Sequence, residues 1–105
     1  MSLDDRQRAF EEKFSHDQEL LFKVQNRAHK LIGLWASEMM SLSPIDSDHY
    51  ARELVSHYIE RPESGRIYEK IKADFADKKI DMSDHRIQKM MEELHETARK
   101  QVMEQ

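Results

Sequence analysis

The sequence predicts an all-α protein: a compact four-helix bundle with a partly disordered or fraying N-terminal helical arm. Three observations predict this fold class. The 105 residues include only two glycines and two prolines, so the chain can make few turns. Leu, Met, Glu, Lys, Arg and Gln, which favour helices, are frequent. Apolar residues recur at spacings of three and four, the period of an amphipathic helix.

The first stretch of apolar residues follows a heptad pattern and is interrupted only by Asp17. Ser15 and Gln18 have the spacing of a capping box just before an apolar run, so the first bundle helix could begin near Ser15. Residues 1–14 then form a separate helix, and an isolated helix shorter than about 12–15 residues is barely stable in water. We therefore divide the chain into an arm, residues 1–14, and a four-helix bundle, residues 15–105. The seam residues are Phe10, Phe14, Leu21, Val24, Ala28, Leu31 and Trp35.

A second helix is predicted after the break at residues 41–44, with Asp46 or Ser47 as its cap. Pro62 ends this helix, because proline cannot donate the next backbone hydrogen bond. The helix carries a stripe of apolar residues at helical spacing. These are Ala51, Leu54, Val55, Tyr58 and Ile59.

A short third helix and a longer fourth helix complete the bundle. Residues 77–82 connect them, and Ser83 is a good cap for the fourth helix. Short loops between amphipathic helices favour a compact four-helix arrangement. The third helix is marked by Ile67, Tyr68, Ile71 and Phe75, and the fourth by Ile87, Met90, Met91, Leu94, Ala98 and Val102.

Composition excludes several classes of function. Charged residues make up 36% of the chain and hydrophobic residues 38%, so the core is modest, and the net charge of −4 gives no basic face for nucleic acid. There is no cysteine for a disulfide, a thiol nucleophile or a zinc thiolate site. No apolar run approaches the roughly 20 residues that cross a bilayer, and the charged N-terminus is not a signal peptide. We expect a cytoplasmic protein without direct membrane insertion.

The arm carries aromatic residues that the bundle does not need. Phe10 and Phe14 are four residues apart and share a helix face with Leu3, so they could fill one groove on a partner. Burying each ring is worth about 1.5–3 kcal/mol before ordering costs. Three positive and six negative residues give the first 19 residues a charge of −3, which favours salt bridges at a protein interface over binding to a polyanion. The alternative is that Phe10 and Phe14 are ordinary core residues of an extended first helix.

The N-terminal region resembles the zeta subunit family of alpha-proteobacterial F-type ATP synthases, formerly a domain of unknown function. The resemblance rests on Asp4-Asp5-Arg6, Ala9-Phe10-Glu11, Lys13-Phe14, His16-Asp17, and Leu31 with Gly33-Leu34-Trp35. Members of this family inhibit ATP hydrolysis. The resemblance implies that the N-terminal helix inserts into the soluble catalytic head, formed by the alpha, beta and gamma subunits, and blocks hydrolytic rotation. It also implies a peripheral location at the cytoplasmic face of the inner membrane.

The sequence departs from the family pattern at two places. Leu3 stands where a phenylalanine is expected, and Ala28-His29 replaces a more usual Arg-Asn pair. We predict that the partner-binding residues all belong to the arm and its junction with the bundle. They are Leu3, Asp4, Asp5, Arg6, Arg8, Ala9, Phe10, Lys13, Phe14, His16 and Asp17.

The sequence gives little support for a metal site, a catalytic site or a nucleotide site. Glu92 and His95 have the Glu-x-x-His spacing of di-iron bundles, but the second such motif is missing, so we predict no metal site. Two glycines cannot build a glycine-rich phosphate loop, and we predict no enzyme activity and no catalytic residue. The resemblance implies weak binding of adenine nucleotides but no cofactor. The cations that could contact phosphate are Arg66, Lys70, Lys72, Arg86 and Lys89.

The open alternative is a non-inhibitory helical adaptor that binds another protein complex. Such an adaptor would also use an exposed arm, so the arm alone does not decide between the two functions.

Overall fold

The computed structural model describes residues 3–60 and 65–104, with side chains for residues 16–59 and 67–104. These residues form four helices and no strand, which confirms the predicted fold class. The helices are α1 (Leu3–Met39), α2 (Pro44–Glu60), α3 (Gly65–Asp77) and α4 (Asp84–Met103).

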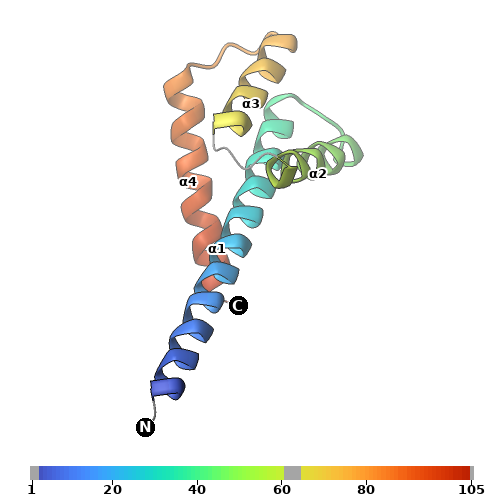
Figure 1. Cartoon of the computed structure of the whole chain (residues 1–105). Helices are drawn as coiled ribbons and strands as arrows, with labels where there is room; N and C mark the ends of the chain where they lie inside the picture. Colours follow the sequence, from blue (N-terminus) through green and yellow to red (C-terminus); the bar gives the residue numbers. More distant parts are fainter. Residues whose placement is uncertain (1–2, 61–64, 105) are drawn as a thin grey trace.

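Helix α1 is the axis of the molecule, and α2 and α4 both pack against it (Figure 1). Helix α4 runs antiparallel beside α1, whereas α2 crosses α1, and the short α3 lies at the end of the bundle far from the N-terminus. The first turns of α1 extend past the end of α4, with no other described helix beside them. The molecule is therefore long and narrow, with extents of 63 × 24 × 23 Å.

The prediction that a helix begins near Ser15 is wrong, because α1 continues from Leu3 through Ser15 to Met39. The arm and the bundle thus share one helix. No glycine or proline interrupts this stretch before Gly33, and each added helical residue contributes another backbone hydrogen bond. The division of the chain between residues 14 and 15, and the fraying of the arm, stay predictions.

The sequence predicted the N-cap of α4 correctly, but not the N-cap of α2. Ser83 is the N-cap of α4, as predicted, and its side chain accepts a hydrogen bond from the backbone N–H of Arg86 at 3.2 Å. The cap of α2 is Ser43 rather than Asp46 or Ser47, since the Ser43 hydroxyl accepts from the N–H of Asp46 at 3.2 Å. Pro44 then occupies the first helical position, where its missing N–H has no cost.

The core lies in the half of the molecule away from the arm. Trp35 meets Phe75 edge-on, with ring centroids 5.7 Å apart. Gly33 lets α1 and α2 approach closely, because a Cβ at this position would lie 2.7 Å from the Cα of Ala51. The buried cluster is formed by Ile32, Ala36, Leu54, Ile67, Ile71, Phe75 and Ile87.

Two predicted core positions are exposed instead. Leu21 is half exposed because it precedes Val24, where the bundle begins to cover α1. Ile59 is 56% exposed near the end of α2. Both residues continue an apolar stripe beyond the point at which another helix packs on it.

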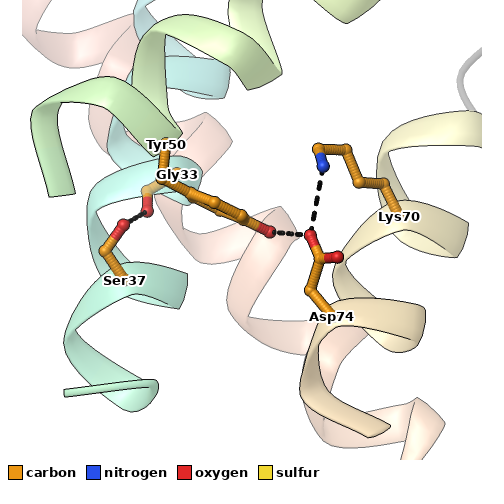
Figure 2. A network of polar contacts seen from close by, with 5 residues as sticks. All are labelled: Gly33, Ser37, Tyr50, Lys70 and Asp74. Atoms are coloured by element: carbon orange, nitrogen blue, oxygen red, sulfur yellow. Dashed lines mark hydrogen bonds and ion pairs between the residues drawn. The ribbon is translucent and has the colours of Figure 1, made fainter. Parts of the chain in front are cut away.

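Polar contacts tie the helices together around this core. The Tyr50 hydroxyl of α2 donates to the Asp74 carboxylate of α3 at 2.7 Å, and Lys70 pairs with the same carboxylate at 3.2 Å (Figure 2). Burial, followed by this hydrogen bond, raises the pKa of Tyr50 above its usual range. Arg27 of α1 donates to Gln101 of α4 at 2.7 Å. The first contact thus joins α2 to α3, and the Arg27–Gln101 hydrogen bond joins α1 to α4.

Candidate partner-binding site

The predicted partner-binding residues occupy the exposed end of α1. Their backbone is helical from Leu3 onward, but the side chains up to Phe14 lie outside the residues whose side chains are described. His16 and Asp17 are exposed at the junction with the bundle. The structure thus places these residues on one helix without showing their side-chain contacts. The predicted partner-binding residues whose side chains lie outside the described part are Leu3, Asp4, Asp5, Arg6, Arg8, Ala9, Phe10, Lys13 and Phe14.

The helical register relates the arm to the core. With 3.6 residues per turn, positions 10 and 14 fall on the same side of α1 as positions 24 and 28. Val24 and Ala28 are buried by the bundle. The face that the bundle covers from Val24 onward therefore continues along α1 past the end of α4, where no described helix covers it.

A groove between α1 and α2 lies directly beyond this arm, and the sequence analysis missed it. We call it the α1–α2 groove. It has a volume of about 880 Å³ and is open to solvent. Its lining consists of Glu19, Phe22, Lys23, Asn26, Arg27 and Lys30 from α1, of Asp48, Ala51, Arg52, Val55, Ser56 and Ile59 from α2, and of Val102 from α4.

The α1–α2 groove combines apolar surface with positive charge. Phe22 is 52% exposed and Ile59 is 56% exposed, although both are large hydrophobic residues. Buried Ala51 and Val102 extend the apolar lining. Four basic and two acidic residues line the groove and give it a formal charge of +2, against −4 for the whole chain.

Some polar groups of the groove are already engaged, while others are not. Arg52 pairs with Asp48 at 3.1 Å, and Arg27 is held by Gln101. Lys23 and Lys30 are exposed to solvent. The Oδ1 atom of Asn26 is buried without a hydrogen-bond partner, which is costly for an amide oxygen.

A signal for this groove was present in the sequence. In helical register Phe22 lies well away from the Val24 and Ala28 face, so it cannot belong to the same apolar stripe. In the sequence, Phe22 stands in the apolar run that follows Gln18. Only the crossing of α2 shows that Ile59 lines the same groove as Phe22.

A smaller pocket surrounds His29 on the other side of α1. The His29 ring packs against Tyr58 at a tilt of 45°, with ring centroids 4.0 Å apart, and its Nδ1 atom is buried with no hydrogen-bond partner among the described residues. Burial, and secondarily the nearby His95, lowers the pKa of His29 to about 4. His29 is therefore a neutral residue of the bundle at neutral pH.

The predicted Glu-x-x-His pair also lines this pocket. Glu92 and His95 lie beside His29 in a volume of about 240 Å³. Among the residues that the structure describes, no three histidine, cysteine, aspartate or glutamate side chains gather closely enough to hold a metal ion.

Two of the cations considered for phosphate binding form ion pairs within the bundle. Lys70 pairs with Asp74, and Lys72 pairs with Asp84 at 3.2 Å. Arg86 and Lys89 are exposed on α4, and the side chain of Arg66 lies outside the described residues. These positions do not converge on one described pocket.

Comparison with known proteins identifies the relatives of this chain. A family model described as ATPase inhibitor subunit zeta matches residues 1–101, which include the arm and most of the bundle. No curated protein and no solved structure matches the chain. No helix in the part of the chain that the structure describes has the length and apolar character that a membrane crossing requires.

Proposed function

Since the chain belongs to the ATPase inhibitor subunit zeta family, we propose that it inhibits ATP hydrolysis by inserting its N-terminal arm into the soluble catalytic head of F-type ATP synthase. In this proposal the arm contacts the alpha, beta and gamma subunits and blocks rotation in the hydrolytic direction. The protein then acts as a binding partner of an enzyme rather than as an enzyme. Its place in the cell is peripheral, on the cytoplasmic face of the inner membrane, through ATP synthase.

The observation that carries this proposal is the uncovered end of α1. The helix extends past the end of α4, and its positions 10 and 14 continue a face that the bundle buries at Val24 and Ala28. An apolar helix face that no other helix of the described residues covers is suited to a groove in another protein. The family match includes these residues.

The bundle supports the proposal as a rigid holder. Ile32 and Ala36 of α1 are buried in the core, and the Arg27–Gln101 hydrogen bond joins α1 to α4. An arm that is held in one direction loses less conformational freedom on binding than a free peptide does.

The test is a titration of ATP hydrolysis by the purified catalytic head of the cognate synthase. The full chain and a shortened chain that begins at Ser15 are compared over the same concentration range. We expect inhibition by the full chain and none by the shortened chain. Circular dichroism of the shortened chain checks that the bundle is still folded.

Two other results of this titration would contradict the proposed function of the arm. Equal inhibition by both chains would show that the bundle, and not the arm, is the inhibitor. Absence of both inhibition and complex formation would favour the adaptor function.

A further inference from the structure

We propose that the α1–α2 groove is a second docking surface, which binds an acidic amphipathic helix of the ATP synthase. This inference rests on the proposed function and adds a site in the bundle to the site in the arm. The arm and the groove would then both contribute to the affinity.

The apolar lining is the first reason. Phe22 of α1 and Ile59 of α2 line the same groove, and each exposes more than half of its side chain. Covering a large apolar side chain is worth about 1.5–3 kcal/mol relative to leaving it in water. An exposed apolar groove with a polar rim is typical of a protein-binding surface.

Charge identifies the kind of occupant. The groove carries a formal charge of +2 on a chain with a net charge of −4, and its exposed Lys23 and Lys30 lie one above the other on α1. Positive charge around an apolar centre is complementary to a partner with acidic residues beside an apolar stripe.

The shape of the groove suits a helix. Along α1 the lining extends from Glu19 to Lys30, a distance of about 16 Å at 1.5 Å per residue. This length accepts about three helical turns, so the occupant presents apolar residues at i, i+3 or i+4, and i+7.

Two other occupants are disfavoured. A second copy that paired groove to groove would bring two positively charged surfaces together, since a two-fold contact uses the same surface on both copies. The arm of the same chain cannot reach the groove, because α1 is continuous from Leu3 to Met39 and directs the arm away from it.

The arm and the groove are fixed relative to each other. Position 14 and Phe22 are eight residues apart on one helix, or about 12 Å along its axis. Because the two sites face different sides of α1, a partner that encloses this helix and holds the arm brings a second surface to the groove at a high effective concentration.

The test measures binding of the full chain to the purified catalytic head by fluorescence anisotropy, at low and at high salt. Two variants alter the groove: Lys23→Glu/Lys30→Glu and Phe22→Ala/Ile59→Ala. Their matched controls, Lys89→Glu/Lys100→Glu and Ile45→Ala, alter exposed residues that do not line the groove. Thermal melting of each variant checks the fold.

We expect both groove variants to raise Kd by about tenfold or more, and both controls to stay within about twofold. The lysine variant is also expected to reverse the dependence of Kd on salt, since the formal charge of its groove changes from +2 to −2 and salt then screens repulsion from the acidic helix. At saturating concentration the lysine variant still inhibits ATP hydrolysis, because its arm is intact. Groove variants that bind like the wild type and the controls would overturn the docking surface.

A cross-linking experiment identifies the occupant. A photoreactive benzoylphenylalanine replaces Ser56 in the groove or, as the control, Gln88 on α4; both residues are exposed. We expect only the Ser56 position to cross-link, to an acidic helical peptide of the catalytic head. Cross-links to a second copy of this chain, or equal yields at both positions, would overturn the proposal.

The two proposals fail in different ways. If the wild type inhibits but the groove variants bind normally, the docking surface is wrong and the inhibitory arm stands. If the wild type binds without inhibiting and the groove variants weaken binding, the docking surface stands and the inhibitory function is wrong. If the wild type neither binds nor inhibits, both are wrong.

Discussion

At the scale of single residues, His29 shows how the bundle constrains a titratable group. The residue is 8% exposed and packs against the tilted ring of Tyr58, and its pKa is lowered to about 4 because burial disfavours the charged form. The unfolded chain therefore binds more protons than the folded chain between about pH 4 and 6.5. This difference links the stability of the bundle to pH.

The direction in which stability changes with pH gives a prediction. The contribution of His29 is present above pH 6.5 and is lost as the pH falls toward 4, so the free energy of unfolding decreases over this window. Urea denaturation at several pH values measures it. A His29→Phe variant keeps an aromatic ring against Tyr58 and is expected to flatten the pH dependence, whereas His85→Gln, at an exposed position, is not. An unchanged slope in His29→Phe would contradict the assignment.

Gly33 gives a second prediction at this scale. Alanine is a better helix former by about 1 kcal/mol, but its Cβ would lie 2.7 Å from the Cα of Ala51, a backbone atom that cannot move without shifting α2. We expect Gly33→Ala to lower the free energy of unfolding by roughly 1–3 kcal/mol in spite of the gain in propensity. Urea denaturation checks this, with the exposed Ala73→Gly calibrating the propensity. A stabilised Gly33→Ala protein would mean that the helices are not in close contact.

Phe10 and Phe14 give the prediction that separates the arm from the core. Phe10→Ala and Phe14→Ala are expected to weaken inhibition of ATP hydrolysis by about tenfold or more each, since each ring is worth about 1.5–3 kcal/mol when buried. The melting temperature of the bundle stays almost unchanged. Ile45→Ala, at a strongly exposed position of α2, serves as control for loss of an apolar side chain. A loss of bundle stability of several kcal/mol would instead make these residues core.

At the scale of elements, the continuity of α1 is the central feature. One helix carries the arm, one wall of the α1–α2 groove and part of the core at Ile32 and Ala36. A change of direction within α1 therefore changes how the arm is presented, even where no contacting residue is altered.

A proline at Gln18 tests this continuity. It removes one backbone hydrogen bond of α1 and clashes with the carbonyl of residue 14, which bends the helix between arm and bundle. We expect Gln18→Pro to raise the concentration needed for half-maximal inhibition of ATP hydrolysis, while Gln18→Ala does not. The bundle keeps its tertiary structure, because Gln18 is exposed and precedes the buried part of α1. Unaltered inhibition by Gln18→Pro would show that the direction of the arm is unimportant.

The sequence predicted elements where a strong local signal marks their ends. Ser83 is the N-cap of α4, whereas Pro62, the predicted stop of α2, lies outside the described residues. The predicted helix start at Ser15 is wrong. The capping pair there lies within an uninterrupted helical pattern, and helix propagation outweighs a local cap.

The same limit applies to the candidate site. The arm stays a prediction from its aromatic residues and from family resemblance, since its side chains up to Phe14 lie outside those described. The groove could not, since the exposure of Phe22 and Ile59 depends on where α2 crosses α1, and no local pattern encodes that crossing.

At the scale of the whole molecule, the shape departs from that of an ordinary domain. The Cα radius of gyration is 17.2 Å. A compact chain of this length has about 13 Å. The difference comes from the end of α1 that extends past α4.

Small-angle X-ray scattering tests this shape in solution. An extended α1 predicts a radius of gyration near 17.2 Å for the full chain, with a clear decrease for the chain that begins at Ser15. A value near 13 Å for the full chain would mean that the arm folds back on the bundle.

The position of Trp35 has a spectroscopic consequence. It is the only tryptophan of the chain, and it packs against Phe75 in the core, away from the arm. Its fluorescence therefore reports the integrity of the bundle and does not respond to the arm. Far-UV circular dichroism, in contrast, sums the helical signal of both parts. Ellipticity lost at a temperature where the emission of Trp35 is unchanged thus measures unwinding of the arm alone, in the unlabelled wild-type protein.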